Sequence, residues 1–294
     1  MGGGECRSND YGSAAYWDAR YSSPSPSSST GGGGGGAFFD WYQTYPALRP
    51  LLRARLPASS RVLMLGCGNS LLSEDMVKDG YEEVVNVDIS SVVIEQMREK
   101  HVDIPQLTCS VFLINFMFMV CKFMVSLQGL FTWYLMFQDF EMDVRDMSLF
   151  GDGTFDCVLD KGTLDAMMCG NDAPLGASKM LAEVARLLRP GGIYMLITYG
   201  CPKERVQLLY QAGSHRKIEL YIMSTPGYEL KWSKGVSLAQ PIMEEVSLTV
   251  DGQLPPDYVL KDPESHFIYI CKKPNAANGA DSVVANEGET ITSK

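Results

Sequence analysis

The stretch 61–70 reads RVLMLGCGNS and decides the fold. Its first five residues form a mainly apolar run typical of a buried parallel strand, and the run ends at a glycine turn before a helical pattern begins. Gly66 and Gly68 let the backbone of this turn approach a ligand closely. The next apolar run, 84–87, ends at Asp88, about 20 residues after the turn, where a doubly wound sheet presents an acid to a ribose diol. This order of strand, glycine turn, helix, strand and acid predicts a site for a nucleoside cofactor.

The glycine pattern narrows the choice of cofactor. The dinucleotide fingerprint needs a third glycine at the sixth position, counted from Gly66, and this chain has Leu71 there. NAD is therefore disfavoured, and a mononucleoside ligand without a pyrophosphate fits the shorter turn. S-adenosylmethionine is the commonest such ligand. A strand-to-helix turn that binds nothing is the alternative, which the position of Asp88 disfavours.

Four segments occur in the order found in class I methyltransferases. They are VLMLGCGNS at 62–70, NVDISSV at 86–92, MDVRDM at 142–147 and LDKGTLDA at 159–166. They most resemble the methyltransferase-like branch that includes lysine methyltransferases acting on translation elongation factor 1-alpha. The resemblance covers roughly residues 16–190. It implies S-adenosylmethionine as the cofactor and an α/β, Rossmann-like fold, in which helices cover both faces of a mostly parallel seven-stranded sheet.

The acids after the second and third strands are the main polar contacts expected for this cofactor. The spacing of Asp88 favours a bidentate contact with the ribose, with Ile89 beside it, and a helix-capping surface acid is the alternative. The resemblance implies that Asp143 binds the adenine amino group and that the backbone of Val144 lies next to it. A surface turn is the alternative there. Lys161 is implied as a further contact on the cofactor side.

Aromatic residues before the first strand are implied to cover the cofactor. Trp17 and Tyr21 are four residues apart, so they share one face of a predicted helix. The similar YWDxRY segment of the family implies that they close over the bound cofactor, whereas simple packing on the domain is the alternative. The family's Asp-Trp dipeptide likewise implies a contact from Trp41.

The fourth strand ends in two aspartates that could serve catalysis. Methyl transfer is an in-line displacement at a sulfonium, so a protein mainly aligns the nucleophile, excludes water and favours the neutral form of an amine. No covalent intermediate or metal is expected. Asp160 and Asp165 could orient an incoming ammonium and accept its proton, directly or through water. Alternatively, Lys161 and Asp165 form an ordinary ion pair at a helix start.

Length and composition predict one large α/β domain. The chain has 294 residues, of which 46% are hydrophobic, enough for a full core. We expect a flexible N-terminus at 1–15, a methyltransferase domain at 16–273 and a disordered tail at 274–294. The run SSPSPSSSTGGGGGG at 22–36 predicts a flexible linker inside the domain.

The net charge and the cysteine content limit which partners and which cellular compartment are expected. The net charge of -10 disfavours nucleic acid, because phosphate backbones are bound by clustered basic faces. The eight cysteines form no CxxC pair and show no His spacing for zinc, and no signal peptide precedes them. These features predict reduced thiols in an intracellular, cytoplasmic protein. The acidic charge would suit a basic protein partner, but solvated surface charge is the favoured explanation.

The segment 109–139 departs from the resembled family. Its stretch 111–137, VFLINFMFMVCKFMVSLQGLFTWYLMF, is long and apolar enough to cross a hydrocarbon core of about 30 Å. A membrane span at this place would separate two neighbouring strands of one sheet. We therefore interpret the insertion as a translated retained intron or a gene-model error, with a genuine membrane anchor as the alternative. An apolar insertion beside the adenine pocket could also disable this isoform.

Taken together, these features predict an S-adenosylmethionine-dependent methyltransferase (EC 2.1.1.-), specifically a protein-lysine N-methyltransferase. Translation elongation factor 1-alpha is the candidate substrate, on the basis of the resemblance alone. A small-molecule methyltransferase and an inactive isoform are the alternatives.

Overall fold

The apolar run of the opening motif is β1 (Arg61–Leu65), and its last four residues are buried. β1 pairs in parallel with β2 (Glu83–Asp88) on one side and with β4 (Phe155–Lys161) on the other. In this register Leu65 lies opposite both Val87 and Asp160. The carboxyl ends of the three strands therefore meet at one edge of the sheet, as a doubly wound fold requires.

The computed structural model describes residues 10–23, 40–101, 137–170, 172–211, 217–228 and 242–275. The other strands are β3 (Phe137–Glu141), β5 (Leu188–Thr198), β6 (Lys217–Met223), β7 (Met243–Val246) and β8 (His266–Lys272). The helices are α1 (Ala14–Ser22), α2 (Tyr45–Arg55), α3 (Leu72–Lys78), α4 (Ser91–His101), α6 (Thr163–Met168), α7 (Ala173–Leu187) and α8 (Pro202–Gln211).

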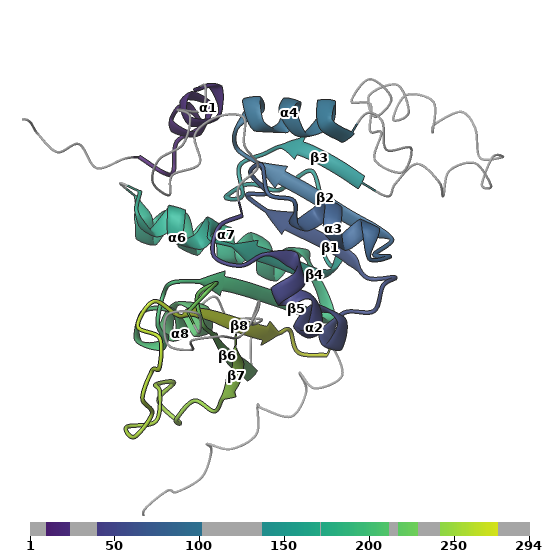
Figure 1. The fold of residues 1–294 in the computed structure, drawn as a ribbon. Coiled ribbons are helices and arrows are strands. Elements are labelled where there is room, and N and C mark those ends of the chain that lie inside the picture. Colours follow the sequence, from purple (N-terminus) through teal and green to yellow (C-terminus); the bar gives the residue numbers. More distant parts are fainter. Residues whose placement is uncertain are drawn as a thin grey trace, which may run out of the picture.

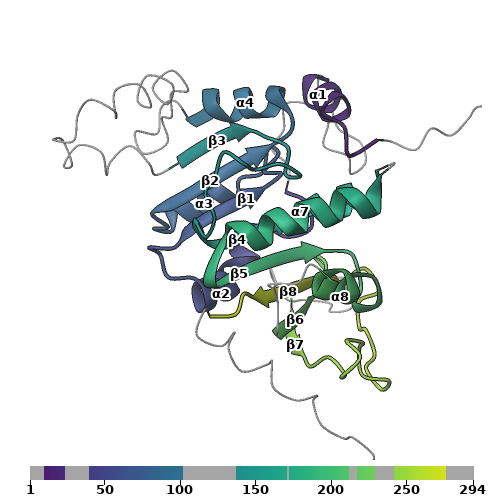
Figure 2. The ribbon, with the colours of Figure 1, turned by 180° about the vertical axis from the view of Figure 1, so that it is seen from behind.

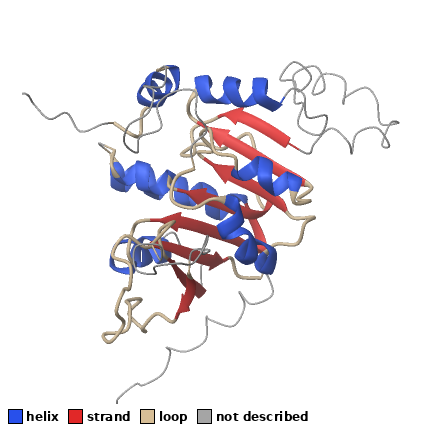
Figure 3. Ribbon diagram, in the orientation of Figure 1, coloured by secondary structure: helices blue, strands red, loops and turns tan. Residues whose placement is uncertain are grey.

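The strands form one continuous layer in the order β3-β2-β1-β4-β5-β8-β6-β7 (Figure 3). β1 to β5 run parallel to one another, β8 is antiparallel to β5 and β6, and β7 is antiparallel to β6. The predicted α/β, Rossmann-like fold is confirmed, but the sheet has eight strands instead of seven. The additional strand is the four-residue edge strand β7, whose MEEV sequence lacks the apolar alternation that predicts a strand.

The hydrophobic core lies in two layers, one on each face of the sheet. α2 and α3 cover the face seen in Figure 1, and α7 and α8 cover the opposite face, seen in Figure 2. Alternate residues of β1 serve both layers, because successive side chains of a strand point to opposite faces. Val62 and Met64 pack in the layer of α2 and α3, whereas Leu63 and Leu65 pack in the layer of α7 and α8.

The third strand begins within the predicted insertion. β3 begins at Phe137, inside the expected insertion 109–139, and pairs with β2 from Val84 to Asp88. The apolar stretch 111–137 lies outside the described residues apart from Phe137. Of the helices within the described ranges, none combines the length and the apolar character needed to cross a membrane.

The remaining predicted boundaries are only partly covered by the described residues. α1 begins at Ala14, two residues before the expected start of the domain at Tyr16, and it ends at Ser22, the first residue of the expected linker. The remainder of the linker lies outside the described residues, apart from Ser23. The expected tail lies outside them beyond Asn275.

The packing of α7 gives a direct test of the core. Leu181 is 1% exposed in the layer shared with β1, whereas Leu175 on the same helix is 59% exposed. Leu181→Ala should lower the free energy of unfolding by about 2–5 kcal/mol, through lost burial and the cavity left behind. Leu175→Ala should lower it by less than about 0.5 kcal/mol. Chemical denaturation of both variants measures the difference, and equal losses would contradict the assigned face of α7.

Candidate functional site

A cavity of about 310 Å³ opens at the edge where the carboxyl ends of β1, β2 and β4 meet. Its size lies at the lower end of the range usual for sites of small ligands. Its walls include every predicted cofactor contact and one of the two predicted catalytic aspartates. These residues are Trp17, Tyr21, Trp41, Gly66, Gly68, Asp88, Ile89, Asp143, Val144, Lys161 and Asp165.

The glycine turn is shaped by packing as well as by backbone geometry. Gly66 and Gly68 have φ values of +54° and +53°, in the left-handed region that favours glycine. A Cβ on Gly66 would collide with Thr163, whose hydroxyl donates a 2.8 Å hydrogen bond to the Leu65 carbonyl. A Cβ on Gly68 would lie 2.8 Å from the Tyr21 hydroxyl oxygen. The absence of side chains at the two glycines therefore lets Thr163 and Tyr21 pack against the turn, and it also exposes the backbone of the turn.

Asp88 is buried at the end of β2, with an exposed fraction of only 6%. Its carboxylate accepts hydrogen bonds of 2.9 Å from the backbone N–H groups of Gly68 and Ser90. Burial raises the pKa of Asp88 to about 6, although these hydrogen bonds oppose the shift. A carboxylate can accept about four hydrogen bonds, so acceptor capacity remains for a ligand. Asp88 is thus a wall of the cavity and not a surface acid.

α1 is held beside the cavity by polar contacts with α4 and with Ser90, the residue before α4. Ser90 donates a 2.6 Å hydrogen bond to Asp18, and the Gln96 amide donates a 3.1 Å bond to the Tyr21 carbonyl. The rings of Trp17 and Tyr21 stack with their centroids 6.0 Å apart, and both rings line the cavity. α1 and α4 lie side by side at the β3 edge of the sheet in both ribbon views (Figures 1 and 2). The same helix thus packs on the domain and covers the cavity.

Asp143 lies in the turn after β3 and is held by Arg145. The guanidinium of Arg145 approaches an Asp143 carboxylate oxygen to 2.6 Å, and the Arg145 backbone N–H donates a 2.9 Å bond to the other oxygen. Burial by itself would raise the pKa of Asp143, but the hydrogen bonds from Arg145 outweigh it and lower this pKa below its ordinary value. Asp143 is therefore an ionised acceptor in the cavity wall.

Lys161 is buried at the end of β4 and binds the segment before α2. Its ammonium lies 3.3 Å from Asp40 and donates a 3.0 Å hydrogen bond to the Trp41 carbonyl. Burial lowers the pKa of Lys161, and the charge of Asp40 opposes this shift. The alternative ion pair between Lys161 and Asp165 is not what the structure shows, because Asp165 pairs with Arg205.

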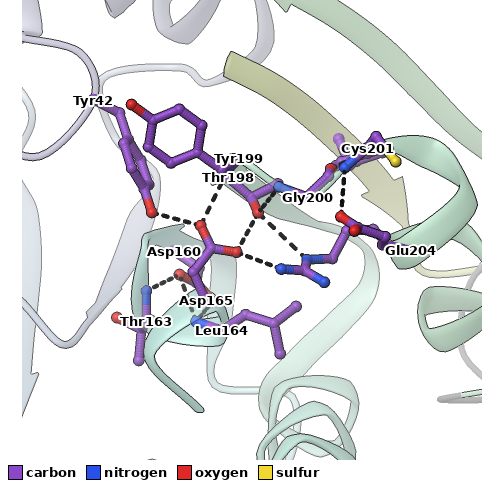
Figure 4. Close-up of polar contacts among 12 residues, drawn as sticks. Tyr42, Asp160, Thr163, Leu164, Asp165, Thr198, Tyr199, Gly200, Cys201 and Glu204 are labelled. Carbon is purple, nitrogen blue, oxygen red and sulfur yellow. Dashed lines mark hydrogen bonds and ion pairs between the residues drawn. The ribbon is translucent and has the colours of Figure 1, made fainter. Parts of the chain in front are cut away.

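Asp165 is the centre of a polar network at the start of α6 (Figure 4). Its carboxylate accepts hydrogen bonds from the Tyr42 hydroxyl at 2.6 Å, the Arg205 guanidinium at 2.7 Å and the Tyr199 backbone N–H at 3.1 Å. The Thr198 hydroxyl also donates to it. Four donors already occupy this carboxylate, so its main effect is to hold Tyr42 and the end of β5 in place.

Asp160 does not lie where a substrate proton could reach it. Its side chain is fully buried and is absent from the cavity wall. It accepts hydrogen bonds from the Tyr194 hydroxyl at 2.8 Å, the Thr163 N–H at 2.8 Å and the Leu164 N–H at 3.2 Å. Burial raises the pKa of Asp160 to about 7. The predicted contact with an incoming ammonium is therefore replaced by a positioning role at the start of α6.

Several residues of the site have no role assigned from the sequence. Tyr42 directly follows the predicted Trp41 and lines the cavity, so its position beside the Asp-Trp dipeptide was the available signal. Thr163 fills the space beside Gly66. Arg205 comes from α8 and reaches Asp165 across 40 residues of sequence, and no local pattern indicates this contact.

Comparison with known proteins agrees with this geometry. Residues 63–196 match the family model described as a methyltransferase domain. The EEF1A lysine methyltransferase 4 of Mus musculus is 31% identical over 229 residues, which cover 75% of this chain and 69% of that protein. The eEF1A lysine and N-terminal methyltransferase of Homo sapiens is 34% identical over 193 residues, covering 65% of this chain and 22% of that protein.

Among solved structures, a SAM-dependent methyltransferase from Methanosarcina mazei covers 77% of this chain and 98% of its own, with 16% identity and a TM-score of 0.47. The order of strand, glycine turn and acid around the cavity, together with the family model and the Mus musculus relative, identifies the family. The chain belongs to the class I S-adenosylmethionine-dependent methyltransferases.

Proposed function

We propose that this methyltransferase is a lysine N-methyltransferase whose acceptor is translation elongation factor 1-alpha. The observation that carries the proposal is the 31% identity over 69% of a protein named EEF1A lysine methyltransferase 4. The cavity wall is consistent with an amine acceptor, because it contains the aromatic rings of Tyr42 and Tyr199 beside the Asp165 carboxylate. Aromatic faces and carboxylates attract cations.

For the cofactor, we propose that Asp88 accepts hydrogen bonds from the ribose hydroxyls, next to the apolar side chain of Ile89. The Asp143 carboxylate and the Val144 backbone serve the adenine. The support for these roles is that each of these residues lies in the cavity wall and that the Asp88 carboxylate keeps acceptor capacity. In the same scheme, Lys161 fixes the adjoining wall through Asp40.

The glycine turn and the aromatic residues complete the proposed cofactor site. The left-handed backbone at Gly66 and Gly68 exposes the turn to the ligand. Trp17, Tyr21 and Trp41 exclude water from the cofactor, and their π faces favour a positively charged sulfonium.

The bound cofactor supplies an electrophilic methyl group, and the protein supplies alignment. A lysine ammonium must first lose a proton to solvent water, and its neutral amine can then attack the methyl group once the site has aligned the nitrogen. Asp165 is saturated by four protein donors and Asp160 is buried outside the cavity. We therefore assign positioning roles to both aspartates.

The proposed role of Asp88 is testable by direct binding. Asp88→Asn should weaken binding of S-adenosylmethionine by about tenfold or more, because hydrogen bonds to a charged acceptor are worth about 1.5–3 kcal/mol. Asp257→Asn makes the same chemical change at an exposed position and should leave the affinity unchanged. Calorimetric titration of both variants, after thermal denaturation has shown that they fold, gives the comparison. Equal affinities would contradict the ribose contact.

Cofactor binding should also depend on pH. The pKa of Asp88 is raised to about 6, so its carboxylate is largely ionised at pH 7 and largely protonated at pH 5. Only the ionised form accepts hydrogen bonds with both oxygens, so the affinity for S-adenosylmethionine should fall about tenfold between pH 7 and pH 5. Calorimetry across this range measures the effect. In Asp88→Asn the slope should disappear, and a persistent slope would assign the effect to another group.

The acceptor is tested by incubating the full chain with S-adenosylmethionine and purified translation elongation factor 1-alpha. Intact-mass measurement should show the gain of one methylene unit per transfer, and peptide mapping should place it on a lysine side chain. Methylation of only low-mass components of an extract would favour a small-molecule methyltransferase instead. Cofactor binding without any methylation would contradict the proposed acceptor, and a folded full chain that does not bind the cofactor would indicate an isoform disabled by the insertion.

A further inference from the structure

Three aromatic rings meet at one side of the cavity. The ring centroids of Tyr42, Tyr199 and His266 lie 4.7, 4.9 and 4.8 Å from one another, and each pair is tilted or edge-to-face. Tyr42 and Tyr199 line the cavity, whereas His266 is only 2% exposed and packs against both tyrosines. Tyr199 itself is half exposed, so this corner is open to a partner from solvent.

The backbone of Tyr42 is held in an unfavourable conformation. Its φ is +65°, and in the part of the chain that the structure describes no other non-glycine residue has a positive φ. Bulky residues rarely adopt this conformation, and strain of this kind persists only where surrounding contacts fix it. Gly162 is one such contact, since a Cβ there would lie 3.1 Å from the Tyr42 ring. The fold thus places the Tyr42 ring against the turn between β4 and α6.

The hydroxyl of Tyr42 is also held in place by the protein. It donates a 2.6 Å hydrogen bond to Asp165, and the buried Arg205 holds that carboxylate from the other side at 2.7 Å. Figure 4 shows the Tyr42 hydroxyl directed at Asp165. Because the only hydroxyl proton is used in this bond, the phenol oxygen can offer other partners lone pairs alone.

Charged groups of both signs surround these rings, and the cations Lys161 and Arg205 lie close to the acidic side chains. Burial raises the pKa of Tyr199, and the negative charges of Glu264, Asp262 and Asp165 raise it further. Burial lowers the pKa of His266 to about 4, so this ring is neutral at physiological pH and does not repel a cation. Acidic neighbours, aromatic faces and an acceptor oxygen are therefore combined in one corner of the cavity.

We propose that Tyr42 and Tyr199 form the seat for the alkylammonium or amine group of the acceptor. The rings bind the cationic side chain through cation–π contacts, and the Tyr42 oxygen accepts an N–H bond that orients the nitrogen. The inference rests on the proposed function, since it names the residues that would recognise the lysine side chain. Asp165 and Arg205 act as positioning residues that hold Tyr42.

The seat can be tested without knowing the acceptor protein. The probe is n-butylammonium, and n-butanol of nearly the same shape is its neutral counterpart. Both are titrated into the full chain in the presence of S-adenosylhomocysteine and followed by saturation-transfer NMR. Butylammonium should bind about twofold to thirtyfold more tightly than butanol. Equal binding of the two probes would overturn the seat.

Variants test whether the two tyrosines cause the preference for butylammonium over butanol. Tyr199→Leu keeps apolar bulk but removes one of the two π faces, so the preference for butylammonium over butanol should become smaller. Tyr42→Phe keeps the ring and removes the acceptor oxygen. Tyr210→Leu is the matched control, because Tyr210 is an exposed tyrosine of α8 outside the cavity. All three variants should retain wild-type affinity for S-adenosylmethionine, and unchanged butylammonium binding in Tyr199→Leu would overturn the proposal.

Kinetic measurements with elongation factor 1-alpha test the proposed seat separately from the proposed acceptor. Tyr199→Leu should raise KM for the protein about twofold to thirtyfold, and Tyr42→Phe should lower kcat about tenfold to hundredfold through misalignment of the nitrogen. Wild-type kinetics in both variants would overturn the seat and leave the proposed acceptor standing. Selective butylammonium binding that Tyr199→Leu weakens, without methylation of elongation factor 1-alpha, would support the seat and remove that acceptor.

Discussion

The parallel register of β1 between β2 and β4 is the constraint on which the site depends. With Leu65 opposite both Val87 and Asp160, the glycine turn emerges between two acidic strand ends. The Cys67 backbone N–H then donates a 3.1 Å hydrogen bond to the Val87 carbonyl. The pairing with β2 therefore extends into the glycine turn, beyond the last residue of β1. A slip of one residue in either pair would reverse the facing of every side chain at this edge. Strand pairing therefore fixes this edge of the cavity, and the segments that carry Trp17, Tyr42 and Asp143 add the other walls.

Several ionisable side chains lie at this edge of the sheet, and burying any of them without a partner would be costly. The cost of burying each one is offset by its own hydrogen bonds or ion pair. Asp88 and Asp160 accept hydrogen bonds from backbone N–H groups at the ends of turns, whereas Lys161 and Asp165 are paired with opposite charges. Buried charges are tolerated only with such partners. The compensation also fixes geometry, since each partner belongs to a different element. The polar groups thus join the cofactor half of the cavity to the aromatic corner.

The cofactor half of the site could be predicted because its signals are local. Gly66, Gly68 and Asp88 lie within one strand–helix–strand unit with a fixed spacing, and the resemblance supplied contacts such as Asp143 that lie in the same cavity wall. The aromatic corner could not be predicted, because Tyr42 and Asp165 meet across 123 residues. Asp160 does not line the cavity, for a simpler reason. Neighbouring residues at a strand end point to opposite faces, so Lys161 reaches the cavity while Asp160 is turned into the core.

The attachment of α1 has a consequence for how a bound cofactor exchanges with solvent. No residue of this helix is buried, although Trp17 and Tyr21 cover the cavity. Its hold on the domain combines the partly buried Tyr21, which packs against the core layer of α2 and α3, with polar contacts such as Ser90 with Asp18, and segments with little apolar burial open at low free-energy cost. For a cofactor held as proposed, detachment of this helix would uncover the side of the cavity that Trp17 and Tyr21 line, while the sheet stays intact. Exchange of the spent cofactor on that side would then follow the fraying of one surface helix, independently of the stability of the core.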